Sequence, residues 1–429
     1  MFSFKKAAAG VLSCTMLLGS LVISGCSDSN TSGTQSADNT SNGSSTAHQG
    51  EIKDISSVEL VKDMKIGWSL GNTLDGGNES NRGQDPGSIE KSWGNPDTTK
   101  EMIDEIKKAG FNVLRVPTTW DWSTGEAPEY KISDEWFARV KEIVDYGMEN
   151  DMYVILNIHH ETWHDPLEKN YEAASDRLKK IWTQIGNYFK DYDEHLIFEG
   201  LNEPRVRNSD EEWNGGSDAT REVVNKLDAD FVSTIRSLDG NNKLRHLMIP
   251  GYAASSSEVA LKALKIPEND DKLIVSVHAY IPYNFALADN KRSNKWVACK
   301  EGFTNDIDNL ADMLKTLFTD KGQAVIIGEF GARSKDNDKY RAEWAKYYVT
   351  KMKTIGVPCV WWDNGAFIGS GELFGLFDRR NLEWRYPLVK DALISASNGE
   401  YTVDGLKSDT AILDELKKDI AQSKNSSAE

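Results

Sequence analysis

The stretches LIFEGLNEP (residues 196–204) and VIIGEFG (residues 325–331) decide how this chain folds. Each joins a short, unbroken apolar run to a glutamate, Glu203 in the first stretch and Glu329 in the second. Unbroken apolar runs of this length are typical of strands that are buried on both faces, as in a parallel sheet. Two carboxylates at the ends of separate strands can act as a pair with opposite protonation, which is what cleavage of a glycosidic bond requires.

Six further apolar runs of the same kind predict strands at residues 66–70, 112–116, 153–158, 246–249, 274–277 and 357–362. Amphipathic helices alternate with them, as where Met102 and Ile106 share one face of the segment that ends at Gly110. Eight strand-then-helix units predict an α/β fold, a single catalytic domain over residues 51–397 built as a (β/α)8 TIM barrel. An open, doubly wound sheet is the alternative, but no glycine-rich phosphate loop follows the first strand.

The N-terminus predicts export. Lys5 and Lys6 precede an apolar stretch over residues 7–23, and small residues lead up to Cys26. Residues 1–25 resemble a bacterial lipoprotein signal peptide, in which Cys26 would be lipidated; an ordinary signal peptide or an uncleaved anchor is the alternative. Residues 26–50, rich in Ser, Thr, Asn and Gly, predict a flexible linker. We therefore expect a cell-surface protein held to the membrane only by an N-terminal lipid anchor, or a secreted one.

The composition of the chain limits the classes of molecule that it can bind. A formal net charge of −17 opposes binding to nucleic acid or to anionic membrane surfaces, whereas a neutral polysaccharide is compatible with it. Only Cys299 and Cys359 fall in the predicted domain, and a disulfide between them is left open. No Cys or His cluster has the spacing of a structural metal site, so we expect no metal. We also expect no other cofactor, and we expect the protein to be a monomer. The tail, residues 398–429, carries one amphipathic pattern over 412–420, which predicts a helix.

Polar and aromatic side chains occur at six predicted strand ends, where TIM barrels hold their active sites. These are Arg115, His159, His160, Asn202, Glu203, His278, Tyr280, Glu329 and Trp362. Any one of them could be structural, and it is their joint placement that favours a site. Adjacent residues on a strand point to opposite faces, so we expect His159 and His160 not to chelate a metal together. Glu199, inside its strand, is expected to be a buried core carboxylate.

These stretches resemble glycoside hydrolase family 5, the large cellulase family. The resemblance rests on GWSLGNTLD (67–75), LRVP (114–117), NIHHE (157–161), FEGLNEP (198–204), VHAY (277–280), IGEFG (327–331) and WWDNG (361–365). With WGNP (93–96), the first of these most resembles the subgroup of bacterial endoglucanases and xyloglucanases. The family usually has Asn where Ser69 stands, a departure outside the catalytic positions.

The resemblance implies a retaining reaction in which Glu329 is the nucleophile and Glu203 the acid/base. Arg115 and the Tyr280 hydroxyl would keep Glu329 ionised, and the charge of Glu329 would keep Glu203 protonated at first. It further implies supporting roles: His278 bonds Glu203, Asn202 donates to the sugar 2-hydroxyl, His159 contacts the sugar with His160 as a second candidate, and Trp362 forms a platform beneath it.

The implied activity is that of an endo-β-1,4-glucanase acting on cellulose, mixed-linkage glucan or xyloglucan. A mannanase or xylanase of the same fold, a transglycosylase, and a non-catalytic glycan-binding lipoprotein stay open as alternatives. Five more tryptophans are candidates for sugar subsites or for core packing: Trp93, Trp120, Trp122, Trp163 and Trp296.

Overall fold

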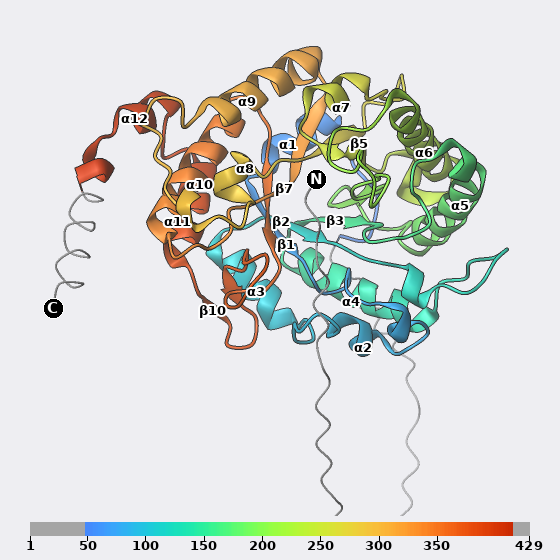
Figure 1. Ribbon diagram of the computed structural model, residues 1–429. Coiled ribbons are helices and arrows are strands. Elements are labelled where there is room, and N and C mark those ends of the chain that lie inside the picture. The colour runs from blue at the N-terminus through green and yellow to red at the C-terminus, as the bar shows by residue number, and fades with distance from the viewer. Residues whose placement is uncertain (1–47, 415–429) are drawn as a thin grey trace, which may run out of the picture. The chain divides into compact units, whose positions relative to one another are not determined.

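Eight parallel strands close into a barrel in chain order, in a computed structural model that describes residues 48–414 (Figure 1). The predicted (β/α)8 architecture is confirmed. The strands are β1 Ile66–Leu70, β2 Val113–Val116, β3 Tyr153–Asn157, β4 Leu196–Glu199, β5 Leu247–Ser255, β6 Leu273–His278, β7 Ala324–Phe330 and β8 Cys359–Asp363. A two-stranded antiparallel sheet, β9 Phe377–Asp378 with β10 Glu383–Trp384, follows β8.

Five strands extend past their predicted ends: β4 to Glu199, β5 to Ser255, β6 to His278, β7 to Phe330 and β8 to Asp363. β7 thus includes Glu329, which was expected beyond the strand, and β8 continues one residue past Trp362, its predicted last residue. The reason is that backbone pairing continues past the apolar run: Glu329 is in register with His278 of β6, and Trp362 with Ser69 of β1. The polar side chains therefore start within the barrel wall.

Helices surround the strands (Figure 1). They are α1 Ser57–Asp63, α2 Pro86–Glu90, α3 Lys100–Ala109, α4 Asp134–Glu149, α5 Tyr171–Tyr188, α6 Asp218–Ser237, α7 Glu258–Ala263, α8 Tyr283–Ala286, α9 Asn305–Leu317, α10 Asp338–Lys353, α11 Pro387–Asn398 and α12 Val403–Ser408. α3 ends at Gly110, whose φ of 112° is left-handed, as its sequence predicts. In α4 the Ser133 hydroxyl caps the N-terminus by accepting from the Trp136 amide.

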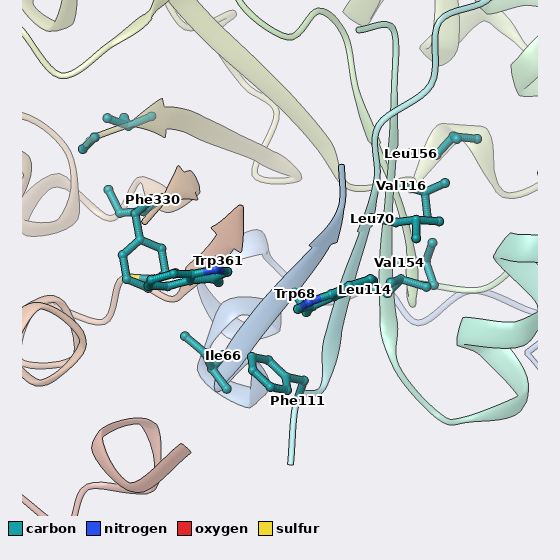
Figure 2. Packing of buried hydrophobic residues seen from close by; sticks show 14 of the residues in the cluster. Ile66, Trp68, Leu70, Phe111, Leu114, Val116, Val154, Leu156, Phe330 and Trp361 are labelled. Atoms are coloured by element: carbon teal, nitrogen blue, oxygen red, sulfur yellow. The ribbon is translucent and has the colours of Figure 1, made fainter. Parts of the chain in front are cut away.

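Alternation along each strand divides the core in two. One set of strand residues, including Trp68, Leu114 and Val154, belongs to the large cluster between strands and helices, part of which Figure 2 shows. The other set faces the barrel interior. Its lower layer is apolar and is closed from below by Leu60, Val61 and Met64 around α1; it comprises Val113, Ile155, Ile197, Met248, Ile274, Ile326 and Val360.

The polar layer lies two residues further along the same strands. Because side chains alternate, residues i+2 face the same interior. Arg115, Asn157, Glu199, Ser276 and Trp362 therefore follow Val113, Ile155, Ile197, Ile274 and Val360 at the carboxyl ends of the strands. The alternation that fills the lower core with aliphatic side chains thus places charged ones directly above it.

The ends of the described segment contact the barrel. Gln49, inside the predicted linker, forms an isolated bridge with Tyr192, and α12 is tied down by an ion pair from Lys407 Nζ to Asp308 Oδ2 at 2.7 Å. The tail therefore packs on the barrel at least as far as α12. The predicted signal peptide and Cys26 lie outside the described residues, as does most of the helix predicted over 412–420.

The structure also describes the two cysteines of the domain and the length and polarity of its helices. Cys299 and Cys359 are both free thiols, so the disulfide that was left open is not formed; Cys359 is buried inside β8. Among the described residues no helix is both long enough and apolar enough to cross a membrane.

Candidate active site

Arg115 lies at the centre of the polar layer. This fully buried guanidinium donates from Nε to Glu199 at 2.9 Å, from Nη1 to Glu329 at 2.7 Å and from Nη2 to Asn202 at 2.7 Å. Burial alone would lower the pKa of Arg115, but the charges of Glu199 and Glu329 raise it above its ordinary value. The cation is thereby fixed, and this rigid fork on β2 positions Glu199 of β4, Asn202 just beyond β4 and Glu329 of β7.

Glu199 balances this buried cation. Its carboxylate also accepts from Asn157 Nδ2 at 3.0 Å and from Ser276 Oγ at 2.6 Å. With no exposed surface and all these partners, it is the hydrogen-bonded core carboxylate that its position predicts.

Glu329 receives a hydrogen bond on each oxygen. Arg115 binds Oε1, and the Tyr280 hydroxyl donates to Oε2 at 2.8 Å. Burial and the adjacent charge of Glu329 raise the pKa of Tyr280 well above its ordinary value, so the phenol keeps its proton and remains a donor. The two donors fix the orientation of the Glu329 carboxylate, as a nucleophile requires.

Glu203, four residues beyond β4, bonds His278, the last residue of β6, at 2.8 Å between Oε1 and Nδ1. The same Nδ1 lies 3.6 Å from Glu329 Oε2. Burial alone would lower the pKa of His278, but the two carboxylates raise it above its ordinary value. His278 therefore holds a proton between the two glutamates.

Opposing influences act on the pKa of Glu203. Burial raises the pKa of Glu203, but the His278 hydrogen bond and the charges of His278, Arg205 and Arg115 lower it overall. Arg205 contributes an ion pair, from Nη1 to Oε2 at 3.4 Å, that the sequence analysis did not consider. The proton therefore belongs to the Glu203–His278 pair as a unit.

The two glutamates are close enough for a retaining reaction. One carboxylate oxygen of each, with a ring nitrogen of His278, lie within 4.8 Å of one another. Retaining enzymes hold their carboxyl groups about 5–5.5 Å apart, whereas inverting ones leave about 6.5–9.5 Å for a water molecule. The shorter spacing matches this site.

Asn202 and His159 each present a donor of defined orientation. Asn202 Oδ1 accepts from Arg115, which leaves its amide NH2 free to donate. At His159 the neighbouring Asn157 decides the tautomer: its Oδ1 accepts from the Thr118 amide, so its Nδ2 donates to His159 Nδ1 at 3.0 Å. Burial lowers the pKa of His159 well below its ordinary value, so the ring is neutral and carries its hydrogen on Nε2.

The expectation that the rings of His159 and His160 diverge is wrong. β3 ends at Asn157, so strand alternation no longer applies, and the ring centroids lie 4.4 Å apart. Both Nε2 atoms face Asp75 Oδ2, at 4.0 Å from His159 and 3.7 Å from His160. These three residues have the donor types of a metal site, but a hydrogen on His159 Nε2 opposes ligation there. Burial raises the pKa of Asp75 to about 7.

The candidate tryptophans divide into two groups. Trp362 lies beside the site, its ring parallel to that of His159 within 3° and 5.7 Å away, and Trp93 lies 43% exposed next to His160. Trp120 and Trp296 are buried in the core and are packing residues. Trp122 is likewise buried, and Trp163 is half-buried with its Nε1 donating to Glu161.

Four side chains around the candidate site were not predicted as site residues. Asp75 lies in the motif that follows β1, and Arg205 lies two positions after Glu203, so proximity in sequence could have suggested both. Glu372 lies in the loop after β8; burial raises its pKa, with a smaller contribution from the charges of Glu329 and Glu203. Trp213 is 61% exposed with Arg205 over its ring at 4.2 Å. No sequence pattern singles out the last two.

The family model "Cellulase (glycosyl hydrolase family 5)" matches residues 77–367. Endoglucanase B of Neocallimastix patriciarum is 49% identical over 347 residues, which is 80% of this chain and 72% of that protein.

Solved structures agree with this match. A GH5-4 broad specificity endoglucanase from Ruminococcus champanellensis with bound cellotriose superposes with a TM-score of 0.75 at 43% identity, covering 80% of this chain and 99% of the other. A GH5 family lichenase from Caldicellulosiruptor sp. F32 gives a TM-score of 0.76 at 43% identity, covering 81% and 97%.

Proposed function

This chain belongs to the cellulase family, glycosyl hydrolase family 5, and from that membership we propose a retaining endo-β-1,4-glucanase whose catalytic pair is Glu203 and Glu329. One observation carries the assignment of the pair: their oxygens and the His278 ring nitrogen lie within 4.8 Å, and each carboxylate has different partners. Arg115 and Tyr280 hold Glu329, whereas His278 and Arg205 hold Glu203.

In the first step the Glu329 carboxylate attacks the anomeric carbon while Glu203 protonates the departing glycosidic oxygen. The proton comes from the Glu203–His278 pair. A sugar seated over the site excludes water and weakens the solvation of the Glu203 carboxylate, which favours moving the proton from Nδ1 to Oε1. His278 is thus a proton store for the acid.

In the second step Glu203, now a carboxylate, takes a proton from water, and the water oxygen attacks the glycosyl–Glu329 ester. The proton taken from water replaces the one that the Glu203–His278 pair gave up in the first step. Departure of Glu329 as a carboxylate restores the charge that raises the pKa of His278, so the pair keeps this proton. The Asn202 amide NH2 and the His159 Nε2 hydrogen donate to sugar hydroxyls, and bonds to the 2-hydroxyl strengthen in the transition state.

β-Glucans are the proposed substrates. Relatives named endoglucanase, broad specificity endoglucanase and lichenase support a chain that accepts β-1,4-glucan of the cellulose type together with mixed-linkage glucan or xyloglucan. Trp362 and the exposed Trp93, on either side of the two histidines, offer flat aromatic faces of the kind that stack on glucose. No metal takes part in the proposed steps.

Export is a separate part of the proposal. The signal-like segment over residues 1–25 and Cys26 support a surface lipoprotein in which the Ser- and Thr-rich segment tethers the barrel. Globomycin-sensitive processing and a diacylglycerol mass increment on the N-terminal peptide would support lipidation, whereas an unmodified Cys26 in the mature chain would contradict it.

The test of function measures reducing sugar and viscosity with carboxymethylcellulose, barley β-glucan, xyloglucan, xylan and mannan. We expect release from the glucans, with viscosity falling faster than reducing ends appear, as internal cleavage requires. Proton NMR of the first products should show the β-anomer. A Glu203→Gln/Glu329→Gln double variant gives the background. The proposal fails if only xylan or mannan is cleaved, or if the α-anomer appears first.

A further inference from the structure

A second pair of histidines lies at the opposite, amino-terminal end of the barrel. His48 precedes α1, and His195 lies in the turn before β4; their ring centroids are 4.1 Å apart. Asp151, in the turn between α4 and β3, faces both rings. None of these residues takes part in the chemistry proposed above. The His195 ring stacks on Tyr153, with centroids 4.7 Å apart, and this contact leaves both of its nitrogens facing carboxylates.

Asp193 orients both rings. Its Oδ2 lies 2.9 Å from His48 Nδ1, and its Oδ1 lies 3.0 Å from His195 Nδ1. A carboxylate has no hydrogen to donate, so Asp193 can only accept from the two rings. Each ring must therefore carry its hydrogen on Nδ1, which in the neutral ring leaves the lone pair of Nε2 free.

The free Nε2 atoms converge on Asp151. Its Oδ1 lies 3.2 Å from His48 Nε2 and 3.9 Å from His195 Nε2, and all three atoms lie within 4.8 Å of one another. Metal–nitrogen bonds of about 2.0–2.1 Å at tetrahedral angles put ligand atoms roughly 3.3 Å apart. The donor atoms are therefore close to coordination distance without backbone movement.

We propose that His48, His195 and Asp151 bind a divalent transition metal ion of the zinc class, with Asp193 as the carboxylate that orients both histidines. Two imidazoles and one carboxylate suit zinc and exclude calcium and magnesium, which prefer oxygen ligands. A carboxylate on the second nitrogen of each ligating ring is the arrangement that fixes the tautomer and strengthens metal binding.

The upper cluster of Asp75, His159 and His160 shows why the lower one is the better site. There an amide, Asn157 Nδ2, donates to His159 Nδ1 and places the hydrogen on Nε2, the atom that a metal would need. At the lower end a carboxylate takes that place and the hydrogen moves to Nδ1. Nε2 of His159 is therefore a hydrogen-bond donor at the carboxyl end of the barrel, whereas Nε2 of His48 and His195 can ligate a metal at the amino end.

The surroundings leave room for the ion. Asp151 is 77% exposed at its side chain and lines a polar hollow of about 740 Å³ together with both histidines. Three lysines that line the same hollow have other partners: Lys53 pairs with Glu194 at 2.7 Å, Lys107 donates to the Asp151 carbonyl, and Lys65 donates to Asn398. Water from the hollow can fill the fourth position.

A bound ion would link the segment before α1 to the barrel. His48 lies at the start of the described chain, and its contacts to Asp193 and Asp151 join it to the turns that precede β4 and β3. Binding to the folded state alone raises the melting temperature as the metal concentration exceeds Kd. We expect zinc to stabilise the chain without changing glucan hydrolysis.

The test titrates the full chain with ZnCl2 by calorimetry and by thermal unfolding, beside His48→Ala, His195→Ala and Asp193→Asn. One zinc per chain should raise Tm. The two histidine variants should lose affinity at least 10-fold, and Asp193→Asn about 10- to 100-fold because it disturbs orientation alone. Asp63→Asn removes a carboxylate from the same hollow but no ligand, and should bind as the parent does.

A further variant separates the two ends of the barrel. If zinc binding survives in His48→Ala and His195→Ala but is lost in His160→Ala, the ion belongs to the upper cluster and the proposal is overturned. Absence of any zinc-dependent heat or Tm shift at millimolar zinc in the parent overturns it as well. Because glucan hydrolysis is measured separately, neither result bears on the proposed enzyme activity.

Discussion

The two ends of the barrel carry similar residues in different settings. At the carboxyl end, Glu199 and Glu329 share a buried arginine, and His278 bonds Glu203. At the amino end, two histidines share the half-buried Asp193 beside an open hollow. The partner of one ring nitrogen, rather than the residue type, therefore decides whether the other nitrogen of a histidine donates a hydrogen bond or can bind a metal.

Removing the two glutamates should have the largest effect, and it should differ between them. Glu329→Gln should lower kcat by at least ~10³-fold on every substrate, because the nucleophile is lost. Glu203→Gln should lose activity similarly on glucan but retain much of the first step on a 2,4-dinitrophenyl cellobioside, whose leaving group needs no proton. Stopped-flow release of dinitrophenol measures this; equal losses on both substrates would contradict the assigned roles. Glu258→Gln, on the exposed face of α7, is the matched control.

Arg115→Met should cost stability as well as activity. It leaves Glu199 buried and unpaired, which destabilises by about 3–5 kcal/mol, measured by urea unfolding. The double variant Arg115→Met/Glu199→Gln removes the unpaired charge and should regain most of that stability while staying inactive. Recovery of activity in the double variant would show that Arg115 acts only as a structural partner.

The proton store can be tested by pH. In the parent, the pair loses its proton at the raised pKa of His278, so activity should fall as pH rises above that value. His278→Asn leaves the proton to Glu203 alone, so the alkaline limb of kcat/KM should move to lower pH. An unmoved limb would mean that His278 does not hold the proton. The raised pKa of His278 also stabilises the folded state. This stabilisation is fully present below about pH 6.5, and it is lost as the pH rises through the pKa of His278 in the folded protein.

A smaller effect is expected at Gly328. A Cβ there would lie 2.8 Å from Ser276 Oγ and 3.2 Å from His278 Nε2, so Gly328→Ala should displace the imidazole. We expect kcat to fall roughly 10-fold, since a misplaced catalytic group is costly even when folding is intact. Gly125→Ala, where the nearest atom is 3.5 Å away, is the control. Parent-like kcat in Gly328→Ala would mean that the ring position tolerates this shift.

The lower end should give the smallest effect on activity. His48→Ala and His195→Ala should change kcat/KM by less than about 2-fold, because neither contacts the polar layer, in contrast to the upper-end variants. A large loss of kcat/KM in either variant, with an unchanged melting temperature, would show that the two ends of the barrel are coupled and do not have separate functions.

Much of this architecture could be predicted because its signals are local. Apolar runs and helix caps fix the order of elements, and β1 begins and ends at the predicted residues. The strand-end residues Arg115, Glu203, His278, Tyr280 and Glu329 meet because a barrel brings its strand ends together. Their catalytic roles stay predictions.

What could not be predicted depends on segments beyond the strand ends. His160 turns toward Asp75 because β3 has already ended, and Arg205 reaches Glu203 from the loop that follows β4. Trp120 and Trp296 are core residues because of tertiary packing that single positions do not reveal. The lower cluster joins residues 48, 151 and 195, whose proximity no local pattern indicates.

The central claim, that Glu329 is the nucleophile held by Arg115 and Tyr280, is tested most directly by trapping the glycosyl-enzyme. The full chain is incubated with 2,4-dinitrophenyl 2-deoxy-2-fluoro-β-cellobioside, and peptides are sequenced by mass spectrometry. The account predicts one adduct per chain, on the peptide that contains Glu329 and on that residue. An adduct on Glu203, or turnover of glucan by a chain whose Glu329 is replaced by Gln, would contradict it.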